Sequence, residues 1–74
     1  SYKDALELEK IEENILLAES KVEGIEKIFS SPDFFEKHAA NTTELNKNLE
    51  TAKQKVKELY DRWEELESLR NSLS

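Results

Sequence analysis

The chain has 74 residues, about half the length of an ordinary domain, so it holds one small unit with a modest core. With 36% hydrophobic and 38% charged residues, one glycine, one proline and no cysteine, its composition is typical of long helices and argues against collagen-like, β-rich or disulfide-stapled folds. The net charge of −6 argues against a general electrostatic attraction to nucleic acid or anionic lipid, but it is compatible with a local basic face. No apolar run approaches the roughly 18 residues of a membrane-spanning helix, and the N-terminus lacks the features of a signal peptide. We therefore expect no membrane partner and a cytoplasmic location.

A heptad pattern runs through the first part of the chain. Apolar residues recur at alternating intervals of three and four, the spacing of the a and d positions of a coiled coil. These residues are Leu8, Ile11, Ile15, Ala18, Val22, Ile25 and Phe29. The pattern predicts a helix over about residues 2–29, roughly 42 Å long at a rise of 1.5 Å per residue.

The same spacing returns in the second part of the chain and predicts a helix over about residues 42–73. Its apolar residues are Leu45, Leu49, Ala52, Val56, Leu59, Trp63 and Leu66. Residues 30–41 form the predicted tip, where Ser31 can cap a short helical turn that has Pro32 in its first position. Asn41 followed by Glu44 resembles a capping box that opens the second helix.

The two heptad patterns match when the helices fold back on each other. Each a residue then faces a d residue whose number adds with its own to 74, from Phe29 with Leu45 to Leu8 with Leu66. We therefore predict one all-α domain over residues 1–74, a two-helix antiparallel coiled-coil hairpin with a short helical turn at the tip. We expect a monomer, although paired heptads would also suit a self-associated bundle.

The ends of a two-helix hairpin need reinforcement, because each helix buries only one stripe. Asp4 and Arg70 occupy the next layer and predict a salt bridge at the open end. Aromatic and apolar residues near both ends are the predicted reinforcements: Tyr2, Tyr60 and Leu69 at the open end, with Phe34 and Phe35 at the tip.

Catalysis finds little support in the sequence. With a single glycine, a phosphate-binding loop of the P-loop type cannot form, so we expect no enzymatic activity and no cofactor in this chain. His38 has no neighbouring set of metal-ligand residues and is interpreted as a surface residue. Trp63 could be a stacking platform for a base, but its a position favours a role as a core anchor.

The two edges of the predicted seam differ in charge. The g positions carry Lys21, Lys55 and Arg62 against Glu7, whereas the e positions are mainly acidic, with a predicted Glu19–Lys53 pair. Lys21 and Lys55 should approach each other as like charges, which a sequence selected for stability alone would avoid. We hypothesise that this edge contacts a phosphate backbone, with Lys21, Lys55 and Arg62 at the centre and Lys47 and Lys57 at the margin. The alternative is that these are the ordinary solubilising lysines of a coiled coil.

Three features in order resemble the C-terminal domain of Uup-type ABC-F ATPases. They are a long helix, the turn Ser31-Pro32-Asp33-Phe34-Phe35, and a second helix carrying Glu58-Leu59-Tyr60-Asp61-Arg62-Trp63-Glu64-Glu65-Leu66. The resemblance covers essentially the whole chain. It implies a coiled-coil hairpin at the end of a cytoplasmic protein with two ATP-binding cassettes and no membrane domain. ATP and Mg²⁺ would be bound by those cassettes, and the terminal domain would be a nucleic-acid-binding accessory in a ribosome-linked or nucleic-acid-linked role.

The resemblance and the basic edge together predict a non-catalytic domain that binds DNA or ribosomal RNA. DNA-binding members of this family are expected to have a clearly basic surface, whereas this chain has a net charge of −6. The nucleic-acid contact is then confined to the basic edge, or binding is weak, or a protein partner takes the place of nucleic acid. The alternative function is a protein-interaction or spacer hairpin that docks on its own cassettes or on another protein. Clustering of Leu16, Leu17 and Ile28 on the surface would favour that alternative.

Overall fold

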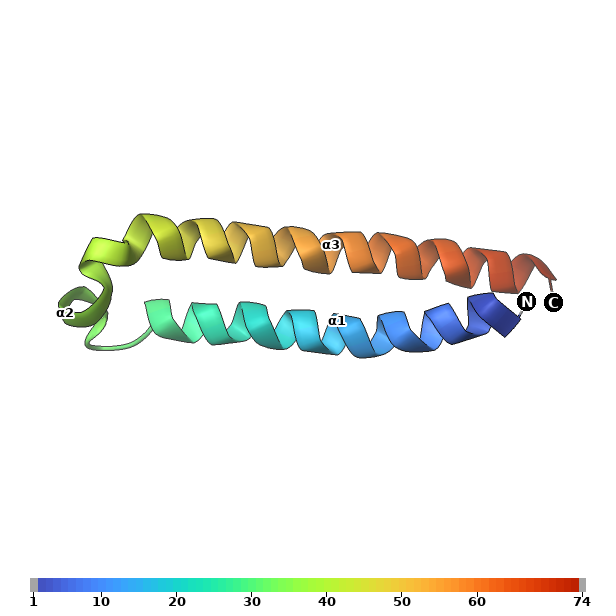
Figure 1. Cartoon of the computed structure of the whole chain (residues 1–74), viewed down its shortest axis with the longest axis horizontal. Helices are drawn as coiled ribbons and strands as arrows, with labels where there is room; N and C mark the ends of the chain where they lie inside the picture. The colour runs from blue at the N-terminus through green and yellow to red at the C-terminus, as the bar shows by residue number, and fades with distance from the viewer. Residues whose placement is uncertain (1, 74) are drawn as a thin grey trace.

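The computed structural model describes residues 2–73 and contains two long helices side by side (Figure 1). Helix α1 spans Tyr2–Phe29 and helix α3 spans Thr42–Leu73. Between them lie the short helix α2, Phe34–His38, and a 3₁₀ turn at Ala39–Asn41. The predicted all-α antiparallel hairpin with a helical turn at its tip is confirmed.

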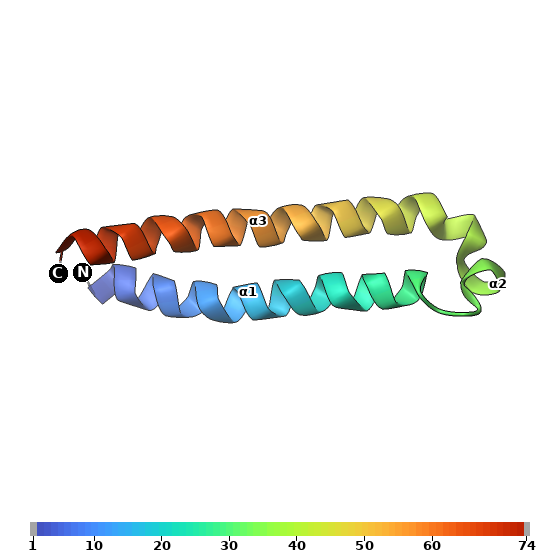
Figure 2. The ribbon, with the colours of Figure 1, turned by 180° about the vertical axis from the view of Figure 1, so that it is seen from behind.

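The hairpin is a rod with extents of 55 × 16 × 15 Å. Its radius of gyration is 16.7 Å, whereas a compact domain of this length would have about 11 Å. Both chain ends lie at one extremity and α2 lies at the other, in both views of the ribbon (Figure 2). Within the described residues, no helix is long and apolar enough to cross a bilayer.

The best-packed part of the seam lies in the half that is nearer the chain ends. Its core is a cluster of four buried residues, with Leu59 and Trp63 packed against it. The cluster contains Leu8, Ile11, Ile15 and Leu66. These are members of the pairs that the heptad register predicts to face each other, and Trp63 is confirmed as a core anchor.

The half nearer the tip is more open. Ala52 is buried, but most of the other seam residues here are only half-buried. The half-buried residues are Val22, Ile25, Phe29, Leu45, Leu49 and Val56. A coiled coil of two helices leaves solvent on both sides of its seam, so seam residues are covered incompletely in this half.

Aromatic contacts organise the tip. The Phe34 ring lies 5.1 Å from the Phe29 ring and 6.0 Å from the His38 ring, measured between centroids. Phe35 is in edge contact with Phe34 at 5.7 Å, but it is 82% exposed and adds little burial. Phe34 is therefore a reinforcement of the tip, as predicted, and Phe35 is not.

The two capping predictions at the tip are wrong. Helix α2 begins at Phe34, and the Ser31 hydroxyl donates to the Asp33 carboxylate and not to a helix N–H. The Phe34 N–H donates to the Ser31 carbonyl at 3.1 Å, which closes a turn around Pro32. Asn41 forms no capping box because it belongs to the 3₁₀ turn that runs directly into α3, whereas a cap needs a non-helical backbone.

The predicted salt bridge at the open end is also not formed. Arg70 Nη1 lies 3.5 Å from Glu67 Oε1 on its own helix, and no ion pair joins Arg70 to Asp4 among the described residues. Tyr2 is 81% exposed and Leu69 is 46% exposed, so neither reinforces this end strongly. A solvated outer layer favours a pair within one helix, since it orders fewer side chains than a pair across the seam.

Candidate nucleic-acid interface

The structure brings together two of the predicted contact residues, Lys21 of α1 and Lys55 of α3. They line one groove between the helices, together with Ala18, Thr51 and Ala52, and we call this site the lysine groove. Ala18 and Ala52 are seam residues whose short side chains leave the space. The sequence places the two alanines in adjacent layers of the seam, each facing a valine, and this opens the g edge beside the two lysines.

The electrostatics of the lysine groove are simple. Both lysine side chains are exposed, and no carboxylate of residues 2–72 lies within 4.0 Å of either amino group. Two like charges near each other raise the local potential and attract an anion that contacts both. Lys21 and Lys55 therefore line one groove, as their shared edge predicts, and neither forms an ion pair with a carboxylate of residues 2–72.

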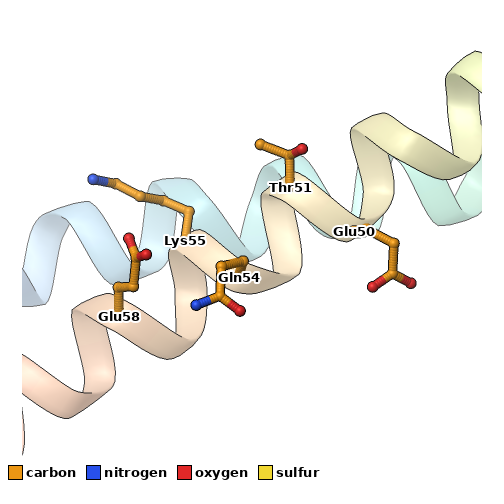
Figure 3. A pocket seen from close by; sticks show the side chains of 5 residues that line it. All are labelled: Glu50, Thr51, Gln54, Lys55 and Glu58. Carbon is orange, nitrogen blue, oxygen red and sulfur yellow. The ribbon is translucent and has the colours of Figure 1, made fainter.

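Carboxylates lie farther along α3 beside Lys55. A shallow pocket on the outer face of α3 is lined by Glu50, Thr51, Gln54, Lys55 and Glu58. Figure 3 shows the Lys55 ammonium extending away from the helix and the Glu50 carboxylate turned to the other side. Mixed charges on this outer face limit the basic surface to the groove itself.

Arg62, the third predicted contact residue, is a clamp between the helices. Its Nε and Nη2 atoms donate to the two oxygens of Glu7, each at 2.9 Å, and its Nη1 donates to Glu65 at 2.7 Å. The hydrogen bond from Arg62 lowers the pKa of the Glu7 carboxyl, and the bond to Glu7 raises the pKa of Arg62. A guanidinium that already holds two carboxylates is a poor phosphate ligand.

The two marginal residues also differ. Lys57 donates to Asp61 at 2.9 Å, one helical turn along α3, and this bond raises the pKa of Lys57. Lys47 is exposed near the tip, with no carboxylate of the described part of the chain within 4.0 Å. Neither residue lines the lysine groove.

The opposite edge of the seam pairs differently from the prediction. Glu19 Oε2 accepts a hydrogen bond of 2.9 Å from the Tyr60 hydroxyl, and Glu19 and Lys53 line one groove without forming an ion pair. Tyr60 follows Lys53 by one heptad and shares its e position, so heptad position alone does not choose between them. Glu12 accepts a hydrogen bond of 3.3 Å from Trp63 Nε1 on the same edge.

Within the described residues, no group of three or more histidine, cysteine or acidic side chains could hold a metal ion. The contacts that sequence reasoning missed are those of Glu7, Glu12 and Glu19 with Arg62, Trp63 and Tyr60 of α3. Only the contact between Glu7 and Arg62 could have been predicted from the heptad positions, because Glu7 is the acidic residue among the basic g positions.

Comparison with known proteins gives one match. The model of a family described as ABC transporter C-terminal domain matches residues 1–68. No curated protein and no solved structure matches the chain.

Proposed function

Because the chain belongs to the family of ABC transporter C-terminal domains, we propose that it is the accessory domain of an ABC-F-type ATP-binding cassette protein and binds nucleic acid. The contact is made by the phosphate backbone of DNA or ribosomal RNA in the lysine groove. ATP and Mg²⁺ act in the cassettes of the parent protein, and this domain, a monomer, supplies no catalytic group.

One observation carries the proposal: Lys21 and Lys55 share a groove, and no carboxylate of the described residues lies within 4.0 Å of either. A backbone phosphate at the groove would meet two ammonium groups from different helices. Arg62 holds the helices beside this site through Glu7 and does not enter the contact. Lysine contacts to phosphate carry no base readout, so binding does not depend on sequence.

The net charge of −6 opposes binding at long range, so the proposed affinity is modest and strongly dependent on salt. Each phosphate neutralised on duplex DNA contributes about −0.9 to the slope of log K against log salt concentration. Contact through two lysines therefore predicts a slope of about −2.

The test is a titration of the chain with short duplex DNA and with structured RNA, followed by amide chemical shifts and by anisotropy at several salt concentrations. Shifts should centre on Lys21 and Lys55 and fade with salt. The variant K21E/K55E should lose binding, whereas the control K10E/K53E makes the same change in net charge away from the groove and should retain most of it. Equal binding by the two variants, with both folded, would contradict the proposal.

A further inference from the structure

Two adjacent leucines of α1 lie on the outside of the hairpin. Leu16 is 69% exposed and Leu17 is 70% exposed, and both lie off the seam. They are the most exposed large aliphatic side chains among the described residues. Single exposed leucines are common on protein surfaces, but two adjacent leucines that are largely exposed and lie outside the core point to an interaction surface.

Three of the four charged neighbours of this pair are carboxylates. On a helix, residues three and four positions apart are surface neighbours, so Glu12, Glu13 and Glu19 flank Leu16, whereas Leu17 has Glu13 on one side and Lys21 on the other. No lysine or arginine of the described residues lies within 4.0 Å of these three carboxylates. We call these five residues the acidic leucine face.

Two of the carboxylates are held in place by neutral donors from α3. The Tyr60 hydroxyl donates to Glu19 Oε2 at 2.9 Å, and Trp63 Nε1 donates to Glu12 Oε2 at 3.3 Å. Trp63 is anchored against the core. Because neither donor is charged, these bonds orient the carboxylates and leave their negative charge uncompensated. Oriented acceptors on both sides of an apolar residue lose less side-chain entropy when a cation binds.

We propose that the acidic leucine face binds a basic amphipathic helix of a partner protein, in which apolar side chains are flanked by lysine or arginine. The leucines would be covered by the apolar side chains and the carboxylates would accept hydrogen bonds from the cations. Phosphate is disfavoured as an occupant because three of the four charged neighbours of the leucines are carboxylates. The acidic leucine face adjoins the lysine groove at Lys21 but does not include that residue, so the two proposals rest on different side chains.

The probe for the experiment is a designed peptide helix with leucine on one face and lysine and arginine on the other. Its titration into the labelled chain should shift the amides of residues 12–19 and saturate. L16A/L17A should weaken binding by about tenfold or more, since it removes apolar contact without changing charge. The control L6A/L69A changes two other exposed leucines and should leave the affinity within about twofold.

A second peptide, with serine in place of leucine, distinguishes binding through apolar contacts from non-specific electrostatic attraction. The proposal predicts at least about tenfold weaker binding of this peptide. Equal binding of the two peptides, equal binding by L16A/L17A and the unchanged chain, or shifts centred elsewhere would overturn it. So would self-association of the chain that L16A/L17A abolishes, because the occupant would then be a second copy. Circular dichroism checks that each variant remains helical.

Discussion

The two halves of the hairpin use the same heptad pattern but differ in packing. The half near the chain ends buries Leu8, Ile11, Ile15 and Leu66, and the Arg62–Glu7 clamp joins its helices. In the half near the tip the seam residues other than Ala52 remain partly exposed. The difference shows that a regular heptad pattern sets which residues face each other but does not by itself set how well they are buried, since leucine and isoleucine occupy the seam in both halves.

The lysine groove lies between these two halves. It occupies the level of Ala18 and Ala52, where the small seam residues leave space beside Lys21 and Lys55. The proposed binding surface and the buried cluster therefore occupy successive stretches of one interface.

The largest difference in stability between the two halves is expected from a matched pair of substitutions on α1. I15A removes methylene groups from the buried cluster and should lower the free energy of unfolding by about 2–5 kcal/mol. I25A changes a half-buried residue of the tip half and should cost about 1 kcal/mol. Urea unfolding followed by circular dichroism measures both. If I15A leaves no folded state, I15V takes its place, with an expected loss of about 0.5–1.5 kcal/mol. Equal losses at the two positions would show that the halves do not differ.

A smaller effect of opposite sign is expected at Gly24 in the tip half. A Cβ built at this position meets no atom within 4 Å, and the residue lies inside α1. Alanine there should stabilise the chain by about 0.5–1 kcal/mol, because glycine loses more backbone entropy in a helix. A higher midpoint of thermal unfolding for G24A checks this, and an unchanged or lower midpoint would contradict it.

The clamp should give the well-packed half a dependence on pH. The pKa of Glu7 lies below its ordinary value of 4.5 because Arg62 donates to the ionised carboxylate. The resulting stability is complete above pH 4.5 and is lost as pH falls through the lowered pKa. The E7Q variant should be less stable than the unchanged chain at neutral pH, and its stability should fall less than that of the unchanged chain when the pH is lowered. Thermal unfolding at a series of pH values measures both effects. E64Q changes an exposed glutamate of α3 and is the control, for which we expect the pH dependence of the unchanged chain.

The smallest effect concerns the hydrogen bond between Tyr60 and Glu19. Donation to this carboxylate raises the pKa of the Tyr60 phenol above its ordinary value of 10.0. In a Y2F background, where Tyr60 is the remaining tyrosine, E19Q should move that pKa down toward 10.0. Ultraviolet absorbance of the phenolate follows the titration. E12Q alters the neighbouring carboxylate and should have little effect, so a similar shift in that variant would count against a direct bond.

The sequence was sufficient for the fold and for part of the candidate site. Alternating intervals of three and four predict both the hairpin and its register, because apolar burial repeats along the whole seam. The same heptad positions predict that Lys21 and Lys55 share an edge, and they line one groove. Whether that groove binds phosphate stays a prediction.

Polar contacts were less predictable. Lys53 and Tyr60 both occupy e positions, and only the structure selects Tyr60 as the partner of Glu19. At the tip, the Ser31 hydroxyl can donate to a nearby carboxylate instead of capping a helix, and alternatives of similar energy are not separated by residue type. Long charged side chains add further choices, as for Arg70, which pairs within its own helix.

The shape of the rod has a mechanical consequence. Since the start of α1 and the end of α3 lie at one extremity and α2 occupies the other, the hairpin acts as a lever when the first of these extremities is held. A small rotation at the held extremity becomes a large displacement of Phe34 and Phe35, because the arm is 55 Å long. The best-packed layers lie near the pivot, where bending moment is greatest, so the rotation is transmitted along the arm with little loss to local bending.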